Sequence, residues 1–527
     1  MALATGGRRY FSAARILALV REELAPLPGR MDTVWRYVVA SAIVIVISMA
    51  LQVPSLALSL IVVFFTAQEN TVMTRMAGVV LMVGVTISIM LALLLLQLTI
   101  DHPFWRFLGI YTLLFCGMYF MRISKLGTLG YVLALVIVSV QSMVDADSDP
   151  ESITRSVLWT WVVWVYPIIV TIIVNQLLLP ANPGRLLNDE LARQLDEVYQ
   201  QLDARKTQSA APRLSLGAIE RGILSLHRHL SFATRGNSSY WRNEALHLMR
   251  ITAVDRLHTA AGQLSQLPAN EATQAQRDMI DRLQAACRNL QLTIRDRQRF
   301  VLAPGLIDAN LADGVFDTVL QEMAHAVHAL AEAESPLPPT PPAAKASLIA
   351  ADALSNPAYA QFALKTVLAT LLCYLFCSAT QWPGINTAML TCVILALPSV
   401  GAGSHKGVLR ILGCVLGSIV ALFAAVFVIP YLDSITGLLL LTLPVIAAGA
   451  WIAAGSARTN YIGVQLAFAF ALASLSGFGP TIDLTRIRDR LIGILIGVAV
   501  SVFISSTIWP EREGSTLRTM LARLLRS

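Results

Sequence analysis

Residues 77–97 read AGVVLMVGVTISIMLALLLLQ, a run of 21 residues without one charged side chain. A helix of about 20 apolar residues crosses the roughly 30 Å hydrocarbon core of a bilayer. The run therefore predicts a transmembrane helix. Eleven further apolar segments share this character and lie at 37–53, 55–68, 104–121, 127–143, 157–178, 361–379, 384–398, 408–429, 436–454, 461–476 and 491–508.

The composition of the 527-residue chain also indicates a membrane protein. Hydrophobic residues make up 55% of it and charged residues 14%, whereas soluble domains carry about 25% charged residues. The net charge of +7 does not indicate a nucleic-acid partner, because residues 181–350 hold equal numbers of basic and acidic side chains. The excess basic residues lie in the membrane-associated parts, where they orient spans.

These features predict an all-α polytopic membrane protein, with two parallel six-helix transmembrane repeats flanking a cytoplasmic helical domain. Loops rich in Arg and Lys stay in the cytoplasm, so we expect both termini and the central domain there. The expected parts are a basic N-terminus (1–36), a first repeat (37–180), a helical bundle (181–335), a Pro-rich linker and membrane approach (336–357), a second repeat (358–510) and a basic tail (511–527).

The repeat is predicted because polar residues, Pro and Gly recur in the same order in both halves. Six spans per half give both copies the same orientation, and a site between two such halves is typical of transporters. The matching stretches are Gln52-Val-Pro54 with Gln381-Trp-Pro383, Arg75-Met-Ala-Gly78 with Arg410-Ile-Leu-Gly413, and Ile153-Thr-Arg155 with Leu484-Thr-Arg486; Pro180 and Pro510 close the halves.

Nothing in the sequence predicts a cofactor, a metal site or an enzyme. Five of the six cysteines lie in apolar segments, where a thiol behaves as a small hydrophobe. The histidines of the central domain lack the spacing of metal ligands. There is also no Gly-x4-Gly-Lys-Ser/Thr loop for a nucleotide phosphate.

Three stretches resemble the fusaric acid resistance (FUSC) or aromatic acid exporter family, and the run Gly-Phe-Gly-Pro480-Thr-Ile-Asp-Leu-Thr is most similar to its MdtO-type multidrug-efflux branch. The three stretches are Phe362-Ala-Leu-Lys-Thr through Gln381-Trp-Pro-Gly384, Gly401-Ala-Gly-Ser-His-Lys406 through Arg410-Ile-Leu-Gly413, and Arg488-Asp-Arg-Leu-Ile-Gly493 through Trp509-Pro510. The resemblance implies an efflux component of the bacterial inner membrane. It would export aromatic carboxylic acids or amphipathic drugs together with a periplasmic adaptor protein and an outer-membrane channel.

Two apolar segments, 55–68 and 384–398, are too short to cross the bilayer as helices, and both follow a proline. Short spans at matching positions point to a binding site, because their helix N-termini face an anionic group. Trp382 would stack on an aromatic substrate, while amides would bind its carboxylate or phenol. The alternative is an interfacial Trp and a proline that only shape a loop. The candidate substrate-binding residues are Gln52, Gln381, Trp382, Asn386 and Thr387.

Several arginines fall on the outer side of this topology, against the orientation rule. They draw organic anions toward the site, or pair with Asp489 and the acidic stretch at 145–151, or the topology differs locally from this assignment. Lys365, at the cytoplasmic start of the second half, either collects an anion or snorkels to the interface. For proton coupling the candidates are Glu69 and Asp489. The candidates for the anion path are Lys365, Arg155, Arg486, Arg488 and Arg490.

Three functions remain open at this point. The first is a secondary efflux transporter, with proton coupling as the default. The second is a passive organic-anion channel, which the same cations would serve. The third is a membrane-anchored envelope scaffold, for which twelve duplicated spans are excessive. A homodimer is a further hypothesis, since the Gly-x3-Gly motifs at 413–417 and 493–497 favour close helix packing.

Overall fold

The computed structural model describes residues 23–24, 29–147, 149–209, 214–268, 272–296, 300, 314–333, 347–432, 434–456, 458–475 and 483–511. Apart from an isolated β-bridge between Ser124 and Ile349, these residues form only helices, turns and loops, so the all-α prediction is confirmed. The chain divides into two compact units. We call residues 1–69, 74–179 and 346–527 the membrane unit, and residues 70–73 and 180–345 the bundle unit.

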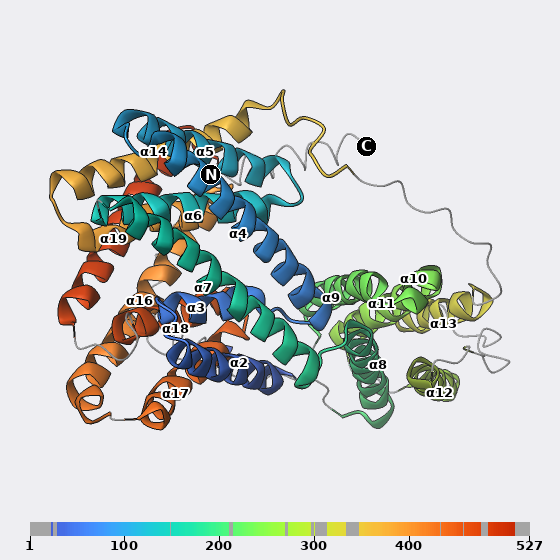
Figure 1. The fold of residues 1–527 in the computed structure, drawn as a ribbon. Coiled ribbons are helices and arrows are strands. Elements are labelled where there is room, and N and C mark those ends of the chain that lie inside the picture. Colours follow the sequence, from blue (N-terminus) through green and yellow to red (C-terminus); the bar gives the residue numbers. More distant parts are fainter. Residues whose placement is uncertain are drawn as a thin grey trace, which may run out of the picture. The chain divides into compact units, whose positions relative to one another are not determined.

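Each of the twelve predicted apolar segments coincides with a helix of the membrane unit (Figure 1). Within the described residues, nine helices are long and apolar enough to cross a membrane, and three more are apolar but shorter. The protein is therefore a multi-pass membrane protein. The elements are α2 (Arg30–Ala50), α3 (Leu56–Thr66), α4 (Thr71–Thr99), α5 (Pro103–Ile123), α6 (Gly127–Ala146), α7 (Pro150–Leu177), α14 (Pro357–Ala379), η1 (Pro383–Ile385), α15 (Thr387–Leu395), α16 (Val400–Phe427), η2 (Ile429–Tyr431), α17 (Ile435–Ala453), α18 (Asn460–Ser474) and α19 (Leu484–Thr507).

Several of these helices begin well before their apolar runs, because a polar side chain caps them upstream. Asp149, Ser399 and Asp483 accept hydrogen bonds from backbone N–H groups in the first turns of α7, α16 and α19. The helices consequently include basic residues that precede the predicted apolar runs. Arg155 and the arginines at 486, 488 and 490 are all helical.

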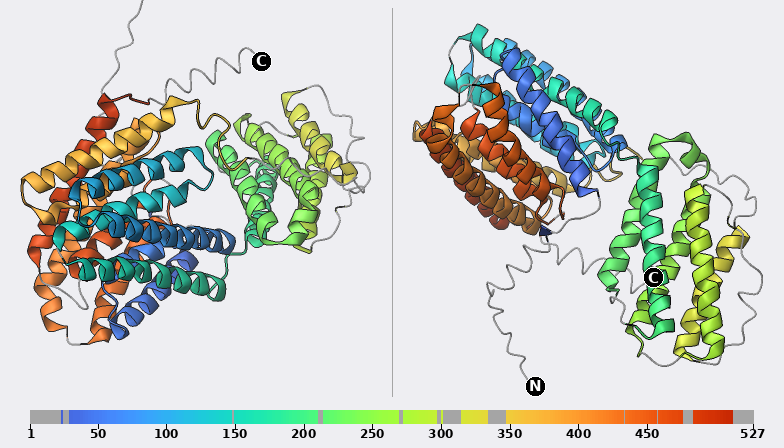
Figure 2. Two further views of the ribbon diagram at one scale, coloured as in Figure 1. Left: turned by 45° about the horizontal axis from the view of Figure 1, so that its top comes forward. Right: turned by 90° about the horizontal axis from the view of Figure 1, so that it is seen from below.

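Helices from the two halves of the chain pack against each other throughout the membrane unit. In Figure 2 the blue and teal helices of the first half lie beside the orange and red helices of the second. Helix α2 packs against α17 and α14 against α5, while α3 packs against α18 and α15 against α6. Each half also contains a tight hairpin, α5 with α6 and α17 with α18.

Glycines allow the closest of these approaches. A Cβ added at Gly117 would lie 2.8 Å from the Gly130 carbonyl oxygen, and one at Gly449 would lie 2.8 Å from that of Gly463. The Gly-x3-Gly motif at 413–417 faces α18, and the motif at 493–497 faces η1 and α15. Both motifs therefore join helices within one chain.

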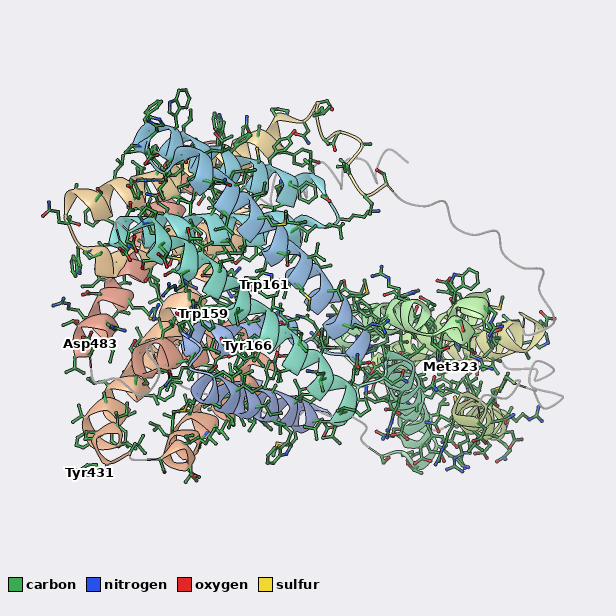
Figure 3. All side chains as sticks on the ribbon, in the orientation of Figure 1. Trp159, Trp161, Tyr166, Met323, Tyr431 and Asp483 are labelled. Carbon is green, nitrogen blue, oxygen red and sulfur yellow. The ribbon has the colours of Figure 1, made fainter. Side chains whose placement is uncertain are left out.

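Polar contacts also fasten α7 to its neighbours. The side chains of Trp159, Trp161 and Tyr166 lie along this helix (Figure 3). Trp161 Nε1 donates to Thr86 Oγ1 of α4 at 3.0 Å, and the hydroxyls of Tyr166 and Ser48 of α2 form a hydrogen bond. Such bonds inside a lipid environment satisfy groups that have no water to bind.

The bundle unit has a hydrophobic core of its own. Leu187, Leu191, Leu195 and Leu202 recur along one face of α8 and are fully buried. Met323 of α13, labelled in Figure 3, belongs to the same core. Its helices are α8 (Pro183–Thr207), α9 (Leu216–Gly236), α10 (Ser238–Arg242), α11 (Glu244–Gln266), α12 (Gln274–Asp296) and α13 (Val315–Ala333).

Some predicted features lie outside the described residues. They include most of the basic N-terminus, the Pro-rich run at 335–342, the Gly-Phe-Gly-Pro run at 477–480 and the tail beyond residue 511.

Candidate functional site

The two short helices lie in the interior of the membrane unit. Helix α3 has 11 residues, of which nine are buried, and α15 has nine residues, of which six are buried. At 1.5 Å per residue they are about 16 and 14 Å long, much shorter than the bilayer core. Their middle residues are enclosed by neighbouring helices, whereas the turns before them, at Gln52 and Gln381, are exposed.

Each short helix follows a strained turn. Gln52 has a φ of 49° and Gln381 a φ of 50°, in the left-handed region that residues with a Cβ rarely adopt. A second matched pair occurs where each half ends, since Leu179 has a φ of 47° and Trp509 a φ of 43°. The side chains of both glutamines are exposed.

The turn before α15 brings three predicted site residues together. The Arg488 guanidinium carbon lies 5.5 Å from the centre of the Trp382 ring, a cation–π distance. Arg488 Nη2 also pairs with Asp489 Oδ1 at 2.8 Å. The Asp489 carboxylate lies against Gly384, where an added Cβ would stand 2.8 Å from its Cγ. We call Trp382, Gly384, Arg488 and Asp489 the turn cluster.

The other predicted substrate residues are arranged less closely. Asn386 and Thr387 are half-buried at the start of α15, next to this cluster in the chain. Gln52 belongs to the corresponding turn of the first half, and within the described part of the chain it forms no hydrogen bond with the turn cluster.

Most of the predicted anion-path cations have carboxylate partners. Arg155 pairs with Glu151 at 2.7 Å on an exposed surface, and Arg486 pairs with Asp483 at 3.0 Å; Figure 3 labels Asp483 at the start of α19. Lys365 is buried, with its Nζ 3.1 Å from the Trp509 carbonyl oxygen and 3.4 Å from Glu511 Oε1.

Arg490 is arranged differently. Its guanidinium carbon lies 5.6 Å from the centre of the Phe468 ring of α18. Its Nε is buried and has no hydrogen-bond partner among the described residues. Its positive charge and that of Arg410 on α16 repel each other.

The proton-coupling candidates lie near helix ends. Glu69 is exposed after the end of α3, and Asp489, with a side chain 14% exposed, is the sixth residue of α19. The other acidic residues in the described membrane helices, Asp32, Asp145 and Glu151, lie in first or last turns. The middle of these helices therefore holds no carboxylate.

Sequence reasoning missed the most deeply buried cation. Arg410 is 1% exposed, although we had named it as part of the sequence repeat and not among the candidate site residues. Its Nε donates to Thr391 Oγ1 at 3.3 Å, and its Nη1 donates to Tyr461 Oη at 2.8 Å and Gln465 Oε1 at 3.0 Å. Ser399 was the available signal, because an N-cap at this position puts Arg410 within α16.

A second cation accompanies Arg410 one turn earlier on α16. Lys406 Nζ donates to the Ile394 carbonyl oxygen at 2.9 Å and lies 5.2 Å from the centre of the Tyr461 ring. In the described structure neither Lys406 nor Arg410 pairs with a carboxylate.

Comparison with known proteins agrees with this membrane architecture. The chain matches the fusaric acid resistance protein family over residues 32–527. It is 34% identical over 514 residues to the multidrug resistance protein MdtO of Escherichia coli strain K12, an alignment that covers 97% of this chain and 74% of the relative. The multidrug resistance protein MdtO of Shigella flexneri matches to the same extent. No solved structure matches the chain. On the match over residues 32–527 and the identity across nearly its whole length, this multi-pass membrane protein belongs to the fusaric acid resistance protein family.

Proposed function

We propose that this protein is a secondary transporter of the inner membrane that exports aromatic carboxylic acids or amphipathic drugs. Family membership and the multidrug resistance relatives support a membrane efflux transporter. The proposal adds the substrate class, coupling to protons, and assembly with a periplasmic adaptor and an outer-membrane channel. Both termini and the bundle unit would face the cytoplasm.

The turn cluster carries the substrate assignment. A Trp ring and an Arg guanidinium meet beside the short helix α15, at 5.5 Å. These are the two groups that recognise an aromatic acid, because the ring stacks on the arene and the guanidinium binds the carboxylate. A substrate of this kind would replace the present contact between Trp382 and Arg488.

An apolar groove supports the amphipathic part of the substrate range. It lies between α2 and α17, has a volume of about 410 Å³ and is lined by residues such as Trp35, Leu439 and Leu443. Drug-sized molecules occupy pockets of about 300–1,000 Å³. The groove would hold an apolar molecule near the substrate's path through the membrane unit.

The proposal includes the two parallel repeats. The paired positive φ angles at Gln52 and Gln381, and again at Leu179 and Trp509, support equivalence of the halves. The mirrored packing of α2 on α17 and of α14 on α5 supports it as well. A transporter built this way would alternate access by movement of one half against the other.

Asp489 is the better of the two candidates for proton coupling. Its side chain is mostly enclosed and contacts both Arg488 and the backbone at Gly384. Protonation would release Arg488, which is then free to bind a substrate carboxylate. Glu69 is exposed after the end of α3.

A passive organic-anion channel is the second candidate function. The observation that favours it is the pair of cations on α16, the buried Arg410 and the half-buried Lys406, in a helix without a carboxylate among its described residues. Such a lining would let anions flow down their gradient. A channel cannot concentrate its substrate, which separates the two candidates.

The test is uptake of radiolabelled 4-hydroxybenzoate into inside-out vesicles that contain the full-length protein, with and without an imposed proton gradient. Accumulation above the outside concentration, abolished by an uncoupler after correction for passive weak-acid distribution, is the expected result. Equilibration that ignores the gradient would favour the channel. No protein-dependent flux would contradict both and leave the envelope scaffold.

Variants of the turn cluster make the test specific. Trp382→Ala should reduce uptake severalfold at equal membrane insertion, and Trp382→Phe should restore part of it, since a phenyl ring also stacks. Trp105→Ala is the matched control, because Trp105 is 59% exposed on the membrane helix α5. Wild-type uptake by Trp382→Ala would remove the cluster from the substrate path.

A further inference from the structure

We propose that Arg410, Gln465 and Arg490 form an intramembrane binding site for the carboxylate group of the transported anion. The inference rests on the proposed function and deepens it, because it assigns the substrate's charge to a second position beyond the turn cluster. Three elements build the site: α16 supplies Arg410, α18 supplies Gln465 and α19 supplies Arg490.

Arg410 carries a positive charge in the interior of the membrane unit. A guanidinium stays protonated in proteins, and burying it without a counter-ion is costly. Arg410 is 1% exposed, and its hydrogen bonds go to neutral oxygens of Thr391, Tyr461 and Gln465. These bonds orient the group but leave its charge unbalanced. A bound anion would balance it.

The site also contains an excess of buried donors. Gln465 is 1% exposed; its Oε1 accepts from Arg410, while its Nε2 has no hydrogen-bond partner among the described residues. Arg490 Nε is in the same condition. Buried donors nearly always have partners, so the unused donor of Gln465, which is hydrogen-bonded to Arg410, and that of Arg490, whose charge acts on Arg410, indicate a missing acceptor. A carboxylate offers two oxygens that accept about four hydrogen bonds.

The site lies where helices pack closely. Gly413 and Gly417 let α18 approach α16, and Gly497 lets α19 approach Thr391 on the short helix α15. Arg410 thus contacts the middle of the short helix α15 through Thr391, among packed helices. Arg488 of the turn cluster and Arg490 lie two residues apart on α19, so one helix joins the two positions.

The position of the first half that the sequence repeat matches with Arg410 holds no buried cation. Arg75, which the sequence repeat matches with Arg410, is exposed in α4. The inference therefore predicts one such carboxylate site per chain, and it provides Arg75 as a matched control residue.

The test measures binding to the full-length protein in lipid nanodiscs, with 4-hydroxybenzoate as the probe and 4-hydroxybenzamide as its uncharged analogue. We expect the wild-type protein to prefer the carboxylate. Arg410→Gln should weaken carboxylate binding by about tenfold or more, because hydrogen bonds to charged groups are strong. Binding of the amide should stay the same. Arg75→Gln should behave as the wild type.

Gln465→Glu gives a second, opposite readout. The new carboxylate would stand beside Arg410 and provide an internal counter-ion, so the melting temperature should rise while 4-hydroxybenzoate binding is lost. A purely structural Arg410 would give the higher melting temperature with unchanged binding. This variant also decides the matter if Arg410→Gln fails to fold.

Three results would overturn the site: no binding of 4-hydroxybenzoate by the wild type, equal affinity for acid and amide, or an unchanged preference in folded Arg410→Gln. The proposed export function fails separately. Carboxylate binding that depends on Arg410, without uptake into vesicles, would contradict export but keep the site. Proton-driven uptake that survives in Arg410→Gln with unchanged affinity would contradict the site but keep export.

Discussion

Gln381 has a left-handed backbone conformation, which is unfavourable for residues with a Cβ. We also assign its side chain to the substrate site. A left-handed residue with a Cβ costs roughly 1–2 kcal/mol, so the turn at φ 50° persists because the helices on both sides require it. The amide side chain is exposed, and among the described residues it has no hydrogen bond that would stabilise the turn. Backbone and side chain can therefore be tested separately.

Replacing Gln381 with Gly should keep the turn and remove the amide. We expect the free energy of unfolding to stay equal or to rise by up to about 1 kcal/mol, because glycine adopts this φ without strain. Uptake of 4-hydroxybenzoate should fall severalfold. Leu179→Gly, which relieves the same strain at φ 47°, is the control and should transport normally. Unchanged uptake by Gln381→Gly would exclude the amide from the site.

We expect Glu23 to make the free energy of unfolding depend on pH. Hydrogen bonds from the Ser456 hydroxyl at 2.9 Å and the Thr459 hydroxyl at 2.8 Å lower the pKa of this carboxyl, against the opposing effect of burial. Because the folded pKa lies below the unfolded value, the stabilisation is present at neutral pH and is lost as pH falls through the folded pKa.

Glu23→Gln should thus lower the free energy of unfolding at pH 7 by less than about 1 kcal/mol, since the group is partly exposed. Thermal melts in detergent should converge for variant and wild type as the pH drops below the usual range of a glutamate. Glu151→Gln, in an exposed pair with Arg155, should show no such convergence. A difference that persists at low pH would assign the effect to packing.

Some residues of the candidate site could be predicted from the sequence, and others could not. The candidate site residues around Trp382 could be predicted from the sequence, because short apolar spans at matching positions of two halves are typical of a binding site. Arg410 could not, since Arg75 stands in the same motif and is exposed. The difference lies in α18, which offers Tyr461 and Gln465 to Arg410, and no local pattern reports such partners.

At the scale of elements, the hairpins α5–α6 and α17–α18 depend on glycine. An added Cβ at Gly117 or Gly449 would stand 2.8 Å from a backbone oxygen of the facing helix, which cannot rotate away. Gly117→Ala and Gly449→Ala should each lower the free energy of unfolding by about 1–3 kcal/mol through overpacking. Gly84→Ala should cost less, because its added Cβ would lie 3.1 Å from the Leu129 Cδ2, which can move, and 3.6 Å from the nearest backbone atom.

These three variants are compared by thermal melting of the purified full-length protein. Equal losses in the two hairpins would agree with equivalent halves. A loss as large at Gly84 as at Gly117 would contradict the backbone explanation.

The existence of the helices could be predicted from hydrophobic runs alone, but their first turns could not. The runs at 157–178, 408–429 and 491–508 correspond to helices that begin at Pro150, Val400 and Leu484. The early turns are polar, and caps at Asp149, Ser399 and Asp483 decide where they start. The arginines of α19 precede the predicted run but lie within the helix. Their contacts with neighbouring helices therefore could not be predicted from the run.

At the scale of the whole molecule, Glu511 connects the two halves of the membrane unit. Its Oε2 lies 3.2 Å from Arg122 Nη2 of α5, in the first half, and its Oε1 lies 3.4 Å from Lys365 Nζ of α14, in the second. Its carbonyl oxygen accepts a hydrogen bond from the Val400 N–H at 3.2 Å, where α16 begins. One carboxylate therefore neutralises two cations that come from separate halves.

Glu511→Gln should consequently destabilise the assembly of the halves. It would leave a buried Lys365 and a mostly buried Arg122 without their anion, so we expect the free energy of unfolding to fall by about 1–3 kcal/mol, the usual cost of losing the partner of a buried polar group. Thermal melting in detergent measures this, with Glu151→Gln as a control of no more than about 0.5 kcal/mol. If both variants melt alike, the halves are held by apolar packing such as α2 on α17 and α14 on α5, and Glu511 only occupies their surface.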